Sequence, residues 1–154
     1  MSVYAVALLV GFVAGLRAFI APAAVSWFAW AHPSGFLSTW SSFMTSIWIR
    51  GIFSILVIVE LVTDQLPTTA SRKTPMQLAP RLLSGGFCGA VLGVSGGNSV
   101  ECALVGVVGA AIGTFGGFEF RSRLAKLLGG RDRPAAVIED VVALAIVLIA
   151  MLNL

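Results

Sequence analysis

The sequence predicts an all-α, polytopic membrane protein, and its composition is the main reason. Hydrophobic residues make up 58% of the 154 residues and charged residues only 11%, whereas soluble domains are about 25% charged. The apolar residues fall in long runs separated by short polar segments. So few charged side chains cannot cover the surface of a water-soluble domain of this size. The composition therefore excludes a soluble globular domain, a disordered chain and a nucleic-acid-binding protein.

Five transmembrane helices account for the chain as a single integral membrane domain over residues 1–154, because each span needs about 20 residues. The expected spans cover residues 3–30, 46–66, 81–96, 100–118 and 135–154.

Local signals mark the ends of these runs. The first run contains Arg17 and Pro22, and it lacks the basic N-terminal region of a cleaved signal peptide, which is the competing interpretation. Pro67 ends the second run. Residues 119–128 have apolar side chains at helical spacing, which predicts an amphipathic helix on the membrane surface. Pro134 opens the fifth run.

The basic residues predict the orientation. Eight of the ten Lys and Arg fall after the second and fourth runs: Arg72, Lys73, Arg81, Arg121, Arg123, Lys126, Arg131 and Arg133. The positive-inside rule then places the N-terminus in the cytoplasm and the C-terminus outside. The four tryptophans cluster around the first outer loop, as an aromatic belt does. This charge bias favours a parallel homo-oligomer over an antiparallel dimer.

Glycines recur at every fourth position in the third and fourth spans. They are Gly85, Gly89, Gly93 and Gly97 in one span, and Gly109, Gly113 and Gly117 in the next. Residues four apart share a helix face, and small residues at this spacing let helices approach closely. The pattern predicts a glycine-zipper hairpin of these two spans. One of the two stripes is alternatively an oligomer interface or the lining of a pathway.

Charged side chains inside the predicted spans need a reason, because each costs at least about 2.5–3.5 kcal/mol near the bilayer centre. The candidate binding or translocation residues are Arg17, Glu60, Asp64, Arg81, Glu139 and Asp140. They have three interpretations: a structural ion-pair network, a polar site open to the cytoplasm that binds a proton, a cation or a small polar solute, or side chains that snorkel to the membrane interface.

Recognisable catalytic chemistry is missing from the sequence. The only histidine, His32, lies in the outer loop, so no HExxH or His-carboxylate metal site can form. There is no GxSxG motif. We expect no catalytic residues and no cofactor, and we expect Cys88 and Cys102 to be packing residues.

Several motifs together resemble a known family. They are GLRAF at 15–19, ELVTDQLP at 60–67 followed by Ser71-Arg72, the glycine-rich spans, and DRPAAVIED at 132–140. Over residues 8–148 they resemble the small bacterial inner-membrane proteins catalogued as domain of unknown function 4126. The resemblance implies a bacterial inner membrane location but no settled activity, cofactor or partner.

The family pattern also bears on the candidate residues. Its signature positions correspond to Arg17, Glu60, Asp64, Glu139 and Asp140. Gln65 departs from the Lys that many relatives carry, which weakens a role for a cation there.

Three functions remain open from the sequence. The first is a small transporter or channel-type subunit, assembled as a parallel homo-oligomer in the lipid bilayer. The second is a membrane-embedded scaffold or assembly factor whose charges only fix helix packing. The third is an enzyme acting on a lipid-linked substrate at the cytoplasmic face, with carboxylates as general acid and base.

Overall fold

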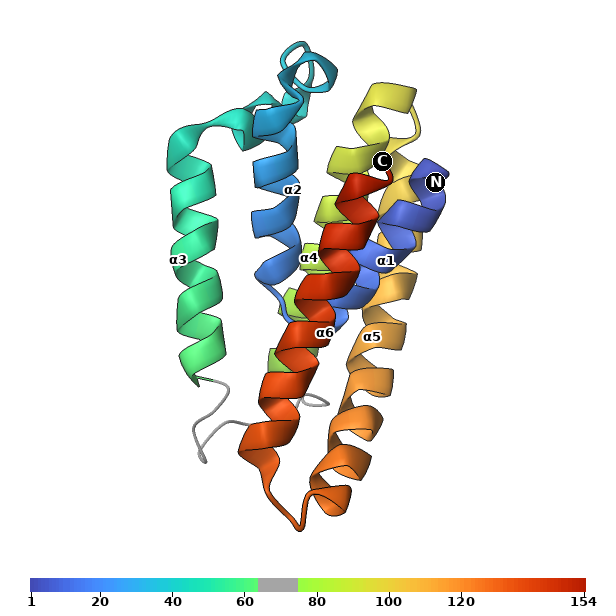
Figure 1. Ribbon diagram of the computed structural model, residues 1–154. Coiled ribbons are helices and arrows are strands. Elements are labelled where there is room, and N and C mark those ends of the chain that lie inside the picture. The colour runs from blue at the N-terminus through green and yellow to red at the C-terminus, as the bar shows by residue number, and fades with distance from the viewer. Residues whose placement is uncertain (64–74) are drawn as a thin grey trace.

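The computed structural model describes residues 1–63 and 75–154, and every regular element within these ranges is a helix. In chain order they are α1 (Val3–Leu16), α2 (Ile20–Ala31), the short 3-10 helices η1 (Pro33–Gly35) and η2 (Trp40–Thr45), α3 (Ile47–Thr63), α4 (Pro75–Gly93), η3 (Val94–Gly96), α5 (Ser99–Leu127) and α6 (Asp132–Leu152). Figure 1 shows an upright bundle of these helices. Within the described ranges, three segments are long and apolar enough to cross a membrane: Met76–Gly96, Ser99–Leu127 and Asp132–Leu152. The predicted all-α class, with helices suited to a membrane, is confirmed at this level.

The predicted first span over residues 3–30 is two helices rather than one. α1 ends at Leu16, Arg17 is extended with φ −143° and ψ 116°, and α2 begins at Ile20. At 1.5 Å per residue the two helices are about 21 and 18 Å long, so each is shorter than the roughly 30 Å hydrocarbon core. The expectation of one continuous membrane-crossing helix here is therefore wrong.

α1 and α2 form a hairpin that returns to the end of the bundle where α1 starts (Figure 1). One pocket at this end is lined by Met1 from the start of the chain and by Phe28 and His32 from the end of α2. The amino group of Met1 also donates a 2.6 Å hydrogen bond to the carbonyl oxygen of Asn153. The two termini therefore lie side by side at one end of the bundle, whereas five continuous spans would place them at opposite ends.

The later helix boundaries also differ from the predicted ones. α4 begins at Pro75, before the expected start at Arg81, and Pro80 lies inside it. α5 continues unbroken to Leu127, so the segment 119–128 is the end of a long helix instead of a separate surface helix. Gly129 and Gly130, with φ of 71° and 82°, then turn the chain into α6.

The glycines of α4 lie directly against the backbone of α5. A Cβ on Gly89 would lie 2.1 Å from the carbonyl oxygen of Cys102, and one on Gly93 would lie 2.7 Å from that of Asn98. On Gly85 it would meet the carbonyl oxygen of Gly106 at 2.7 Å. This contact agrees with the close approach expected of the hairpin, while a zipper function for the repeat in the membrane stays a prediction.

The glycines of α5 serve a different neighbour from the one expected. A Cβ on Gly109 or Gly113 would lie 2.3 or 2.1 Å from the carbonyl oxygens of Leu8 and Phe12 in α1. Gly117 is buried in α5. Gly97 is not a packing residue, because nothing lies within 4 Å of its Cβ position and its φ of 73° makes it the left-handed residue of the turn. α1 thus packs against both α4 and α5.

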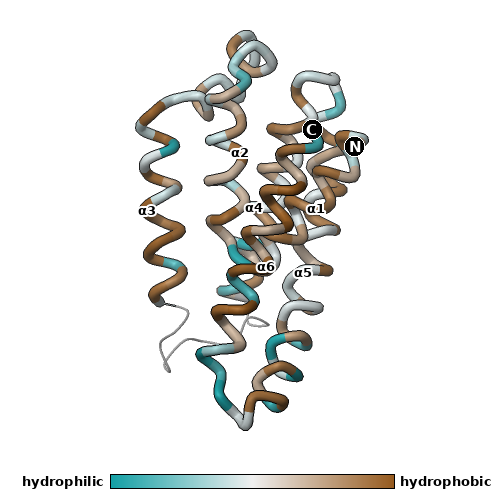
Figure 2. Tube along the Cα trace, in the orientation of Figure 1, coloured by the Kyte–Doolittle hydropathy of each residue, from teal (hydrophilic) through white to brown (hydrophobic). Residues whose placement is uncertain are grey.

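Hydrophilic residues gather where α5 passes into α6, at the end of the bundle opposite the termini (Figure 2). The basic residues of this end are Arg121, Arg123, Lys126, Arg131 and Arg133. Arg72 and Lys73, which belong to the same predicted basic end, lie outside the described residues.

A helix break as the candidate functional site

The break between α1 and α2 exposes backbone polar groups in the interior of the bundle. The last carbonyls of α1 and the first N–H groups of α2 have no partners within their own helices. In hydrocarbon, each such group left unsatisfied costs several kcal/mol. Side chains from α3, α4 and α5 bind these groups, and a side chain from α6 binds the arginine of the break.

Glu60 of α3 binds the start of α2. Its Oε1 accepts a 2.7 Å hydrogen bond from the N–H of Ala18, and its Oε2 accepts one of 2.9 Å from the N–H of Phe19. The helix dipole adds to this attraction, because the N-terminal end of a helix carries a partial positive charge. The carboxylate therefore caps α2 from a different helix, since α2 has no capping side chain of its own.

Arg81 of α4 binds the end of α1. Its Nη1 donates hydrogen bonds to the carbonyl oxygens of Gly15 at 2.7 Å and Leu16 at 2.5 Å. The side chain is buried, with only 3% of the residue exposed. A cation is favourable at this position because the C-terminal end of a helix carries a partial negative charge. The cation therefore lies at the C-terminal end of α1, and the carboxylate of Glu60 lies at the N-terminal end of α2.

Two hydroxyl groups also bind carbonyls at the break. Ser84 donates to the carbonyl oxygen of Ala18 at 2.5 Å. The Thr114 hydroxyl is shared between the carbonyl oxygens of Ala110 in its own helix, at 2.8 Å, and Gly15, at 3.1 Å. Sequence reasoning missed both residues. The available signal was their position in glycine-rich helices, where a hydroxyl can reach a neighbouring backbone.

Arg17 itself points to α6. Its Nε lies 2.6 Å and its Nη2 2.5 Å from Oδ1 of Asp140. Arg17 is fully buried and Asp140 is 8% exposed. The bond joins the hairpin to the last helix of the bundle.

Glu139 contacts an arginine of α5. Its Oε2 is 3.9 Å from Nη1 of Arg121, which also forms an ion pair with Asp132 at the start of α6. Glu139 is nevertheless 1% exposed. Sequence reasoning treated Arg121 only as a topology signal and missed its contact with a buried carboxylate.

The predicted set of six residues is therefore divided by the structure. Arg17, Glu60, Arg81 and Asp140 meet at the break, whereas Glu139 belongs to the α5–α6 contact. Asp64 lies outside the described residues.

A pocket of about 280 Å³ adjoins the break. It is lined by Ala18, Phe19, Val59, Glu60, Thr63, Met76, Gln77, Pro80 and Arg81. The pocket gives access to both charged residues that bind the helix ends. Its other lining residues include the last residue of α3 and the first turn of α4, so it lies toward the basic end of the bundle.

Metal ligands do not cluster within residues 1–63 and 75–154, where no group of three or more His, Cys, Asp and Glu is placed to hold an ion. Cys88 and Cys102 are both buried free thiols.

No protein-family model matches the chain, and comparison with characterised proteins and with solved structures finds no match. The function is therefore inferred from the geometry of the break.

Proposed function

We propose that this protein is a small transporter or channel-type subunit that moves a proton, a cation or a small polar solute, with the break between α1 and α2 as its binding site. The observation that carries the proposal is that Glu60 and Arg81 bind opposite halves of the break and line one pocket. Discontinuous helices with their ends inside the membrane form the ion and substrate sites of many secondary transporters.

Glu60 couples occupancy of the site to the shape of the break. As a carboxylate it accepts hydrogen bonds from two backbone N–H groups. A proton or cation that binds Glu60 neutralises its charge and weakens its attraction to the positive end of α2. The start of α2 is then free to move, which gives a binding event a direct structural consequence.

The orientation we propose places the basic end of the bundle in the cytoplasm of a bacterium, following the positive-inside rule. The pocket at the break then faces the cytoplasm, and both termini lie outside. We also propose a parallel homo-oligomer, because one copy of this short chain has few helices with which to enclose a transport pathway.

Membership of the family catalogued as domain of unknown function 4126 is part of the proposal. Its support is that Arg17 of GLRAF, Glu60 of ELVTDQLP and Asp140 of DRPAAVIED, which are distant in sequence, meet at one place. A shared site explains why such motifs occur together.

Flux in proteoliposomes tests the proposal. Proton and K⁺ flux is measured for the wild type and for Glu60→Gln, with thermal unfolding recorded on the same samples. Glu119→Gln is the matched control, because Glu119 is an exposed carboxylate on α5 paired with Arg123. We expect Glu60→Gln to abolish flux while the folded protein is retained, and Glu119→Gln to leave flux unchanged.

A scaffold is the second candidate, and one observation favours it. The ion pair of Arg17 with Asp140 is buried and direct, so it can hold α6 to the hairpin without any solute. Absence of flux in the wild type, together with a strongly destabilised Glu60→Gln variant, would replace the transporter by the scaffold. Turnover of a lipid-linked substrate that is lost in Asp140→Asn would instead favour the enzyme.

A further inference from the structure

Helix α3 stands at the edge of the bundle. It packs mainly on α2 and η2, and none of its described residues is buried. Figure 1 shows α3 on the outer side of α2, away from α4 and α5. One side of α3 and α2 therefore faces α6 across a groove.

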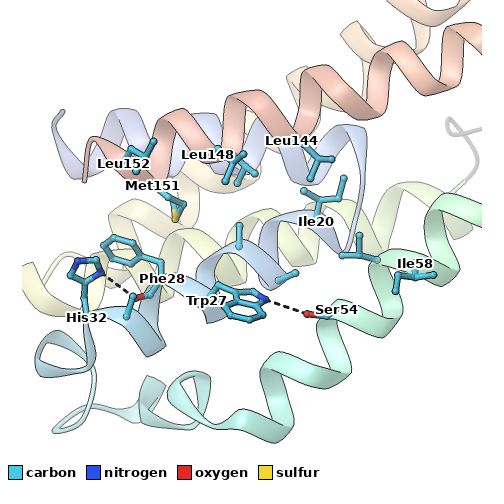
Figure 3. Close-up of a pocket in the computed structure, with 15 residues that line it drawn as sticks. Ile20, Trp27, Phe28, His32, Ser54, Ile58, Leu144, Leu148, Met151 and Leu152 are labelled. Carbon is cyan, nitrogen blue, oxygen red and sulfur yellow. Dashed lines mark hydrogen bonds between the residues drawn. The ribbon is translucent and has the colours of Figure 1, made fainter.

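The groove has a volume of about 660 Å³ and an apolar lining. Figure 3 shows Ile20, Trp27 and Phe28 of α2 facing Leu144, Leu148 and Leu152 of α6. The polar side chains of the lining already have partners. Trp27 Nε1 donates to the Ser54 hydroxyl at 3.2 Å, that hydroxyl donates to the Arg50 carbonyl at 2.8 Å, and His32 Nδ1 lies 3.4 Å from the Phe28 carbonyl oxygen. Water needs two or more polar partners in a cavity, so hydrocarbon suits this groove better.

The length of the groove matches one membrane leaflet. On α2 it extends from Ile20 to His32, a rise of about 18 Å at 1.5 Å per residue. The hydrocarbon core is about 30 Å thick, so each leaflet contributes roughly half of that. A single acyl chain therefore fits the length of the groove.

Arg50 does not itself line the groove, but its guanidinium contacts Trp27, which does. It precedes Ser54 by one helical turn, and its guanidinium carbon is 4.6 Å from the Trp27 ring centroid and 4.2 Å from that of Trp30. The two indoles fix the cation in place, at a level where tryptophans gather as they do beside lipid headgroups.

The charge of Arg50 lacks a counterpart within the described protein. No described carboxylate lies within salt-bridge distance, and its buried Nη1 makes no hydrogen bond to any described residue. A guanidinium is suited to a phosphate, which it binds through parallel hydrogen bonds. The apolar groove and the uncompensated cation are thus complementary to the two ends of one lipid.

We infer that this groove binds one acyl chain of an anionic phospholipid and that Arg50 binds its phosphate. The inference is independent of transport, because the groove contains none of the residues that bind the break.

Quenching of tryptophan fluorescence by brominated lipid tests the inference. Trp40 and Trp48 are replaced by Phe so that Trp27 and Trp30, the two indoles that contact Arg50, are the only tryptophan emitters. The full chain is reconstituted in vesicles that contain phosphatidylglycerol or phosphatidylcholine with brominated acyl chains. We expect brominated phosphatidylglycerol to bind beside Trp27 about fivefold more tightly than phosphatidylcholine, the ratio that corresponds to roughly 1 kcal/mol for one arginine near anionic lipid.

Variants of the groove separate a site from general lipid contact. Arg50→Gln should remove the preference for phosphatidylglycerol, and Arg50→Lys should keep most of it. Ala24→Leu, which narrows the groove, should reduce quenching by both lipids. Ile112→Leu on the exposed face of α5 is the control and should change nothing.

Two results would overturn the inference. Equal quenching by both lipids, unchanged in Arg50→Gln, would mean ordinary contact with bulk lipid. Lack of quenching by either lipid would mean that something else fills the groove, such as a second copy of the chain. Thermal unfolding of every variant, recorded beside the wild type, shows that the comparison is made on folded protein.

Discussion

Arg17 and Asp140, 123 positions apart in the chain, form a buried ion pair in which the arginine Nε lies 2.6 Å from the carboxylate Oδ1. The arginine belongs to the break between α1 and α2, and the carboxylate belongs to α6. Removal of one partner of a buried pair destabilises a protein, because burial of a single charge in a low-dielectric interior costs free energy.

Loss of either partner of this pair should strongly destabilise the protein. We expect Asp140→Asn or Arg17→Gln to lower the free energy of unfolding by about 3–5 kcal/mol, since each removes one side of a buried ion pair. The double variant Arg17→Leu with Asp140→Leu should lose less than the sum of the two single changes. Unfolding by sodium dodecyl sulfate in mixed micelles measures all four proteins.

The exposed pair of Glu119 and Arg123 is the control for this experiment. The side chains are 56% and 75% exposed, and such pairs contribute only about 0–1 kcal/mol. If Arg123→Ala costs as much as Asp140→Asn, burial does not explain the effect.

Replacement of Arg81 by lysine should weaken the break even though the charge is kept. A lysine ammonium is a compact charge without the planar fork of a guanidinium. We expect Arg81→Lys to lose about 1.5–3 kcal/mol of stability, the range for hydrogen bonds made by charged groups. Hydrogen exchange at the N–H groups near the break should rise in the variant, and unchanged exchange there would contradict the assigned contact.

An alanine at Gly89 should force α4 and α5 apart. Its Cβ would lie 2.1 Å from the carbonyl oxygen of Cys102, and backbone cannot yield as a side chain can. Overpacking of this kind costs about 1–3 kcal/mol, which denaturation in mixed micelles would detect.

Gly116→Ala is the matched control on α5, because nothing lies within 4 Å of its Cβ position. Alanine favours a helix over glycine by about 0.5–1 kcal/mol, so this variant should be as stable as the wild type or more stable. Equal destabilisation by both alanines would mean that glycine richness, and not helix contact, matters.

The two ends of the chain should be accessible from the same side of the membrane. In a background with Cys88 and Cys102 replaced by Ala, we expect single cysteines at Ser2 and Leu154 to react with an impermeant maleimide from one side. A cysteine at Lys126, at the basic end, should react from the other side. Labelling of Ser2 and Leu154 from opposite sides would restore the five-span arrangement.

Much of the site could be predicted from the cost of charge in a membrane. That argument selected Arg17, Glu60, Arg81 and Asp140, which the structure brings together. It also selected Glu139, which packs against Arg121 instead. Adjacent helix residues point about 100° apart, so sequence alone could not assign which of the two carboxylates faces the break.

The break between α1 and α2 could not be predicted from hydropathy. Residues 3–30 are apolar enough and long enough to be one crossing helix, and the local signals, Arg17 and Pro22, are compatible with that interpretation. Pro22 lies in the first turn of α2, where proline is tolerated and marks a helix start as readily as a kink.

The sequence by itself determined the helical membrane class, the helices with close glycine contacts and the charges that need partners, because composition and periodicity are local properties of the chain. Only the tertiary structure decided that α1 and α2 turn back, and therefore where the termini lie. The reason is physical: an open break in hydrocarbon needs its backbone groups satisfied. The side chains that satisfy them are distant in the sequence. Glu60 lies 41 positions after Phe19, and Arg81 lies 66 positions after Gly15.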